Sequence, residues 1–292
     1  MSAESDEAQP PALSRDEQLE WEARNAPRAA IAAFVSAALA LASMLLQIIQ
    51  IGTPPDGERQ ALLRFDEHRS DFFVSLGLQV ASYFLLAAVL FYLLRATVYR
   101  RPETPKFTIG LLLLAPVLLA VGGLLNQLEL NDVADRFLDS PERTEKRAED
   151  LLDDRNVLGG ALGSGGTLCL ALSFVLVSLN AMRAGLLSRF MGALGMIVGG
   201  LLILPLLPGG QSTVQIFWLA ALGVLFLGRW PNGRGPAWEA GEAVPWPSAA
   251  ELRGEVPDAG PAPDAAEEGD DQAAPEDAPP PRRSRKRKKK AR

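Results

Sequence analysis

Six long apolar blocks, with the charged residues confined between them, constrain the fold more than any other feature of this chain. The 35 acidic residues divide as seven in residues 1–28, five in 52–71, Glu103 alone, ten in 129–157 and twelve in 239–281. None of them lies inside an apolar block, although 48% hydrophobic and 22% charged residues would suit a soluble protein. This segregation indicates an integral membrane protein and excludes a soluble enzyme.

The lengths of the blocks predict six transmembrane helices. About 20 apolar residues cross a hydrocarbon core roughly 30 Å thick, and a helix satisfies its own backbone polar groups there. We therefore expect an all-α, polytopic fold with a transmembrane domain over residues 29–228. The last block is short, so it either extends into its flank or sits in locally thinned bilayer. The predicted spans are residues 29–51, 72–94, 107–125, 158–180, 190–207 and 213–228.

The positions of lysine and arginine predict that both termini are cytoplasmic. The short connections 95–106 and 183–189 are basic, with Glu103 as their one acid, whereas the loops 52–71 and 126–157 are net acidic. Basic loops stay on the cytoplasmic side of a membrane. We therefore predict a multi-pass protein of the cell (cytoplasmic) membrane, with the lipid bilayer as its partner and the acidic loops outside.

The N-terminal segment, residues 1–28, is predicted to be cytoplasmic and to hold a short helix. Ser14 and Glu17 have the spacing of a capping box, which marks a helix start. Pro27 would then occupy the first turn of the first span. Because the segment is acidic and lacks an apolar core, it does not resemble a cleavable signal.

Local patterns also predict structure in the connections. Leu130, Val133 and Phe137 share one helical face, so the third span is expected to continue outward as an amphipathic helix. Ser140, followed by a proline, is expected to begin the next helix. Residues 208–210 (PGG) predict a tight turn and hence an antiparallel hairpin between the last two spans.

A Trp/Pro-rich juxtamembrane strip, residues 229–247, follows the last span. Trp230, Trp238 and Trp246 recur every eight residues and are predicted to anchor the strip in the lipid interface. The alternative is that the strip is a docking site for a partner protein.

The tail, residues 248–292, is predicted to be disordered because it is acidic, rich in proline and alanine, and too polar to bury a core. It ends in a polybasic patch that could contact anionic lipid headgroups or a cytoplasmic protein. Folding back onto the acidic stretch is a further alternative, and nucleic acid is a less favoured partner. The candidate contact residues are Arg282, Arg283, Arg285, Lys286, Arg287, Lys288, Lys289, Lys290 and Arg292.

Pairs of glycines predict close helix packing in the fourth and fifth spans. Gly159 and Gly163 form one GxxxG pair, and Gly195 and Gly199 form another. The pattern leaves open whether the neighbouring helix belongs to the same chain, so the oligomeric state is not predicted.

Neutral polar residues inside the spans have two interpretations. Gln47, Gln79, Asn180 and Gln215 would each make interhelical hydrogen bonds, worth about 1 kcal/mol. Alternatively, these four residues line a pocket for a lipid headgroup or small neutral ligand, as in a transporter or permease. Ion-coupled transport is disfavoured because no span contains an ionisable residue.

No catalytic motif is present, and one cysteine and one histidine exclude disulfide and His-rich metal chemistry. We therefore expect no cofactor and a non-enzymatic membrane scaffold or interaction protein. The transporter is the second hypothesis. A membrane enzyme that holds a divalent cation in the acidic loops is the third, and the alternation of acids with bases in residues 129–157 disfavours it.

Two stretches resemble a known group of proteins. The first is Arg183–Gly195 (RAGLLSRFMGALG), and the second is residues 228–247, which contain GRWP, PAWE and GEAVPWP. Together they resemble an uncharacterised group of bacterial, chiefly actinobacterial, multi-pass membrane proteins, and more distantly a family defined by a domain of unknown function. The resemblance implies a bacterial inner membrane and a polytopic helical fold, and it implies no activity.

Overall fold

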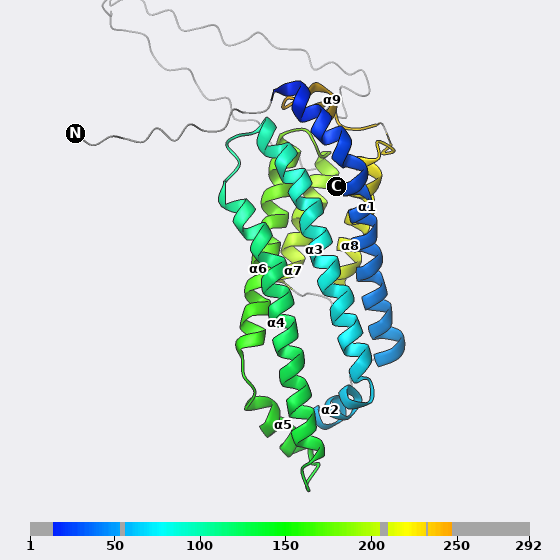
Figure 1. Ribbon diagram of the computed structural model, residues 1–292, viewed down its shortest axis with the longest axis vertical. Coiled ribbons are helices and arrows are strands. Elements are labelled where there is room, and N and C mark those ends of the chain that lie inside the picture. The colour runs from blue at the N-terminus through cyan, green and yellow to red at the C-terminus, as the bar shows by residue number, and fades with distance from the viewer. Residues whose placement is uncertain (1–13, 53–55, 205–209, 232, 247–292) are drawn as a thin grey trace, which may run out of the picture. The chain divides into compact units, whose positions relative to one another are not determined.

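The computed structural model describes residues 14–52, 56–204, 210–231 and 233–246, and no strand occurs among these residues (Figure 1). Four helices are long and apolar enough to cross a membrane, and two shorter apolar helices accompany them. The elements are α1 (Arg15–Leu46) with its π-helical end η1 (Gln47–Ile51), α2 (Glu58–Glu67), α3 (Arg69–Arg100), α4 (Phe107–Leu138), α5 (Glu145–Asp153), α6 (Leu158–Arg183), α7 (Arg189–Ile203), α8 (Gly210–Phe226) and α9 (Pro236–Ala240).

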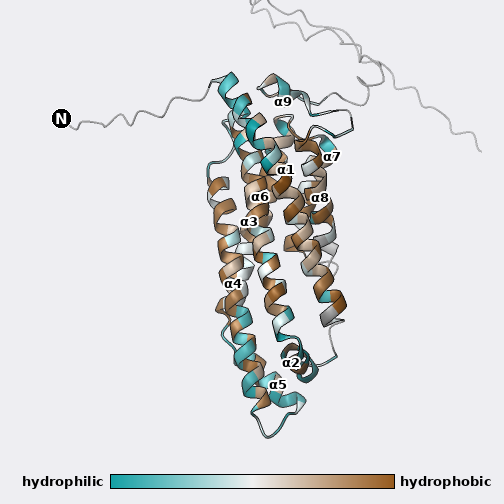
Figure 2. Ribbon diagram, turned by 45° about the vertical axis from the view of Figure 1, so that its right-hand side comes forward, coloured by the Kyte–Doolittle hydropathy of each residue, from teal (hydrophilic) through white to brown (hydrophobic). Residues whose placement is uncertain are grey.

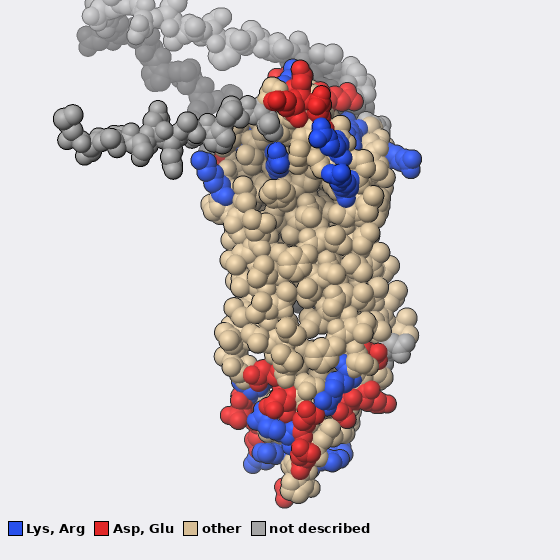
Figure 3. All heavy atoms as spheres, viewed as in Figure 1, with Lys and Arg blue, Asp and Glu red and all other residues tan. Residues whose placement is uncertain are grey.

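The four long helices, α1, α3, α4 and α6, run antiparallel and have two chemically different ends. One end carries the start of α1, the α3–α4 and α6–α7 connections and α9, and we call it the basic end. The other end carries α2 and α5, and we call it the acidic end. Between them lies a belt without charged side chains on the visible face (Figure 3), and hydrophobic residues dominate the helices there (Figure 2).

α1 packs against α3 through small side chains. Six alanines of α1 are buried: Ala26, Ala29, Ala30, Ala33, Ala37 and Ala40. The Ser36 and Ser82 hydroxyls lie 3.1 Å apart, and each lies 2.9 Å from the other residue's carbonyl, to which it can donate. The Ser43 and Ser75 hydroxyls lie 2.9 Å apart. Small residues let the backbones approach closely, and paired hydroxyls satisfy each other where no water is available.

Glycines bring α4 and α6 into close contact. A Cβ on Gly159 would lie 2.6 Å from the Asn126 nitrogen, and one on Gly122 would lie 2.8 Å from the Gly159 oxygen and 2.9 Å from the Gly163 Cα. On α7, a Cβ on Gly195 would overlap the Ser178 hydroxyl, whereas one on Gly199 would lie 2.7 Å from the Ala171 oxygen. The neighbours of both predicted glycine pairs therefore lie in the same chain.

Two predicted helix starts differ from the structure. The capping box at Ser14 and Glu17 is present, but α1 continues from there without a break, so Pro27 lies inside the helix and not in its first turn. In the second acidic loop, α5 begins at Glu145, where the Thr144 side chain accepts from the Arg147 N–H. Thr144 is thus the cap that we had expected at Ser140. Either hydroxyl suits a cap, so composition alone did not distinguish them.

The acidic end has a small core of its own. α4 extends past the apolar block as predicted, and its Val133 and Phe137 are buried against Leu62 and Phe65 of α2 and Leu151 of α5. This core fixes α2 and α5 on the ends of the long helices.

An ion pair network adjoins this core. Arg69 donates to Asp66 at 2.6 Å and to Asp135 at 2.8 Å. These hydrogen bonds raise the pKa of Arg69, and the bond to Asp135 has the larger effect. The guanidinium therefore stays charged. The network ties the start of α3 to α4.

Candidate functional site

The basic end is closed by a group of residues that we call the cap. It consists of Gln18–Glu22 of α1, the end of α3 from Tyr92 to Arg100, the connection 184–187 and residues 233–246. All but the α1 and α3 segments come from the two stretches that resemble the bacterial membrane proteins.

A buried ion pair lies at the centre of the cap. Arg100 binds the Glu22 carboxylate through both terminal nitrogens, at 2.5 and 2.9 Å, and the two side chains are 0% and 3% exposed. Gln18 donates to Glu22 at 2.9 Å, and Arg100 Nε donates to the Ala237 carbonyl at 3.0 Å. A buried charge pair is tolerated when the remaining hydrogen-bonding positions are filled, and these contacts fill them.

Aromatic rings surround the ion pair. Tyr92 stacks on Trp21 and on Trp238, with centroid distances of 5.5 and 6.0 Å, and meets the edge of Phe226 at 5.0 Å. The Tyr92 hydroxyl donates to the Glu22 carbonyl at 3.1 Å, and Trp238 Nε1 donates to the Leu186 carbonyl at 2.9 Å. The rings exclude water from the ion pair, and the Tyr92 hydroxyl and Trp238 Nε1 both have partners.

Two glycines allow the C-terminal strip to pack on the α6–α7 connection. Gly185 has a φ of 78°, and a Cβ there would overlap the Val244 carbonyl. A Cβ on Gly235 would lie 2.6 Å from both the Gly185 oxygen and the Trp246 ring. The two resembling stretches are therefore in direct contact with each other.

The cap corrects the prediction for one tryptophan. Trp238 is 5% exposed and packs inside the protein, so it does not anchor the strip in lipid. Trp230 is partly buried against the main core, and Trp246 is also partly buried. The tail and its polybasic patch, Arg282–Arg292, lie outside the described residues.

Glu22 and Arg100 were missed as a pair because Glu22 was counted among the acids of the N-terminal segment and Arg100 among the basic residues that set the orientation. They are far apart in the sequence, and both lie outside the neighbouring apolar blocks, which cover residues 29–51 and 72–94. The helical capping signal at Ser14 was the available clue. It predicts a helix that continues toward the first span and carries Gln18 and Glu22 on one face, four residues apart.

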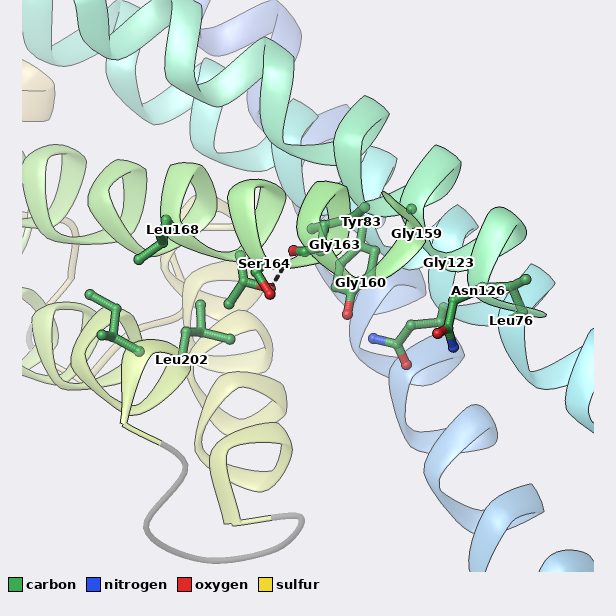
Figure 4. Close-up of a pocket in the computed structure, with 15 residues that line it drawn as sticks. Leu76, Tyr83, Gly123, Asn126, Gly159, Gly160, Gly163, Ser164, Leu168 and Leu202 are labelled. Atoms are coloured by element: carbon green, nitrogen blue, oxygen red, sulfur yellow. Dashed lines mark hydrogen bonds between the residues drawn. The ribbon is translucent and has the colours of Figure 1, made fainter. Parts of the chain in front are cut away.

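A second feature is a cavity between α3, α4, α6 and the end of α7 (Figure 4). We call it the outer recess, after the predicted outer side of the membrane. Its volume is about 650 Å³, and none of its lining residues carries a charge. The polar side chains in its lining are Gln79, Tyr83, Asn126, Ser164 and Thr167. The Gln79 side chain interacts with the Tyr83 hydroxyl, and Thr167 donates to the Gly163 carbonyl of its own helix at 2.9 Å.

The structure does not bring the four predicted pocket residues together. Gln79 lines the outer recess, but Gln47 donates to the Ser75 hydroxyl between α1 and α3 at 3.0 Å. Asn180 donates to the Leu176 carbonyl of its own helix at 2.8 Å, and Gln215 is buried in α8. Hydropathy identified the polar residues in the spans. It did not show which face of its helix each residue occupies, and the face decides which residues line the same cavity.

No group of three or more potential metal ligands occurs among the residues that the structure describes. No protein-family model, curated protein or solved structure matches the chain. The likeness to the bacterial membrane group stays a prediction that is based on the two sequence stretches.

Proposed function

We propose that this chain is a non-enzymatic scaffold or interaction protein of a bacterial cytoplasmic membrane, with both termini in the cytoplasm. Its polybasic tail would contact anionic lipid or a cytoplasmic partner. The observation that carries the proposal is the cap, because it uses a buried ion pair and four aromatic rings to hold the strip that leads into the tail.

The cap gives the tail a fixed origin. Residues 233–246 are held by Arg100 at Ala237, by Leu186 at Trp238 and by Gly185 at Val244. Attachment of the tail to the membrane alone would not require such an ordered connection. A scaffold gains a defined point at the basic end from which a long segment reaches into the cytoplasm.

The tail hypothesis is tested by cross-linking in membranes followed by affinity capture. The full chain is compared with a variant that ends at Pro281 and with a full-length variant in which the nine basic residues of the patch are replaced by glutamine. We expect a defined partner or anionic lipid with the full chain alone. Capture of the same species by all three proteins would overturn the proposal, and the glutamine variant controls for tail length.

We also propose that the membrane domain has six spans, the last two forming a hairpin. α7 and α8 are about 22 and 26 Å long at 1.5 Å per residue, so residues next to the turn must supply the rest of a 30 Å crossing. In a Cys169→Ala background, Gly209→Cys should react with an impermeant maleimide from outside, as should Asp56→Cys at the acidic end. Labelling of position 56 without position 209 would contradict six spans.

A transporter for a neutral or lipidic substrate is the alternative, and the outer recess is the observation that favours it. Transport requires a route to the other side, however, and the basic end is closed by buried side chains, among them Tyr92, Trp218 and Phe226. The recess therefore supports binding more directly than passage.

A further inference from the structure

The outer recess exists because α7 ends before α6 does. α6 and α7 run antiparallel, with Met182 facing Gly192, Ser178 facing Gly195 and Ala171 facing Gly199. Continued at this register, Ile203 at the end of α7 lies level with Thr167. The first two turns of α6 thus have α4 on one side and no other described helix on the side that α7 would cover, and the recess opens there.

Polarity changes with depth along the recess. Gly159 of α6 packs on Asn126 of α4, and Gly166 packs on Leu119. Asn126 lies about 30 Å beyond Lys106 at 1.5 Å per residue, so in a core about 30 Å thick it is at the outer interface. At the same rise Ser164 lies about 8 Å deeper than Asn126, and Leu168 of the same lining lies about 14 Å deeper, inside the hydrocarbon.

Two polar side chains of the lining lack partners in the protein. Asn126 and Ser164 are exposed, and neither has a hydrogen-bond partner among the described residues. Both hold their positions because the close packing of α4 on α6 fixes the backbones that carry them (Figure 4). Polar groups at the edge of hydrocarbon are costly unless they are hydrogen-bonded, so these two groups call for a ligand with its own donors and acceptors.

We propose that the outer recess binds an uncharged acylglycerol, of the diacylglycerol class, from the outer leaflet. The hydroxyl would meet Asn126 at the interface, an ester oxygen would meet Ser164 below it, and an acyl chain would lie along Leu168 toward Leu202 and Ile203. The chemistry is specific in one respect: the lining holds no cation for a phosphate and no carboxylate for an ammonium group.

The test uses the full chain in vesicles of phosphatidylcholine that contain a diacylglycerol with a photoactivatable diazirine on its acyl chain. After illumination, the cross-linked residues are mapped by mass spectrometry. We expect labelling on the recess-lining segments of α6 and α7, competed by unlabelled diacylglycerol. Labelling scattered over the exposed faces of all helices would overturn the proposal, as would equal labelling by a phosphatidylcholine probe.

A matched pair of glycine variants separates binding from general lipid contact. Gly160 lines the recess, Gly77 lies on α3 outside its lining, and neither has an atom within 4 Å of an added Cβ. Gly160→Phe should place its ring in the recess and lower recess labelling about tenfold, the change expected for tenfold weaker binding. Gly77→Phe should leave it unchanged. Equal labelling of the two variants would contradict the site, whereas the outcome of the tail experiment is independent of it.

Discussion

The polar side chains at the two ends of the helical bundle differ in their burial and in their hydrogen bonding. In the cap, Glu22 and Arg100 are almost inaccessible, and Gln18 and the Ala237 carbonyl complete the hydrogen bonds of the pair. In the outer recess, Asn126 and Ser164 are exposed without partners among the described residues. A fully satisfied polar cluster makes a rigid joint, whereas polar groups left open at a cavity are available to a ligand. The comparison separates a structural site from a proposed binding site within one helical bundle.

The largest expected effect comes from breaking the cap. Arg100→Leu leaves Glu22 buried without its partner and should lower the free energy of unfolding by about 3–5 kcal/mol. The matched control is Arg101→Leu, because Arg101 pairs with the exposed Glu103 and such pairs contribute about 0–1 kcal/mol. Thermal or denaturant unfolding in detergent measures both. Equal losses in the two variants would mean that the cap is not a rigid joint.

The glycine contact that supports the recess predicts an intermediate effect. Gly159→Ala puts a Cβ 2.6 Å from the Asn126 nitrogen and should destabilise the protein by about 1–3 kcal/mol through overpacking.

Its neighbour Gly160 is the control for that substitution. A Cβ there meets no atom within 4 Å, so Gly160→Ala should be neutral or stabilise by up to about 1 kcal/mol through helix propensity. The same unfolding measurement compares the two variants. A loss in Gly160→Ala as large as that in Gly159→Ala would show that α4 and α6 are not in the described contact.

The smallest expected effect is a pH dependence at the start of α1. Hydrogen bonds from the Ser14 backbone and hydroxyl hold the pKa of Glu17 below its ordinary value of 4.5. A carboxyl whose pKa is lower in the folded state stabilises that state above its unfolded pKa and loses the contribution as the pH falls through the folded one. At neutral pH the melting temperature of the wild type should therefore be slightly higher than that of the Glu17→Gln variant.

This difference should close below pH 4.5, in the range where Glu17 is protonated. Glu20→Gln, an exposed change on the same helix, controls for net charge. A difference that stays constant down to acidic pH would show that the charge of Glu17 does not take part in the capping box.

The sequence predicted the helical class and the apolar segments because both depend on local hydropathy. It also predicted the capping box at Ser14 and the outward continuation of α4, which are local patterns. It could not predict the cap, since Arg100 meets Ala237 only after six helices have packed. It placed Gln79 in a candidate pocket but not Ser164, because the recess follows from where α7 ends beside α6.

The hydrogen bond between Arg100 and Ala237 also imposes an order on biosynthesis. The two residues are 137 positions apart, so at roughly 5–20 residues per second about 7–27 s pass between their synthesis. During that interval the first helices have already been synthesised, while the Arg100 Nε and the Leu186 carbonyl lack their final partners. The cap closes only when the strip after α8 has left the ribosome, and its closure therefore reports that the whole membrane domain has been made.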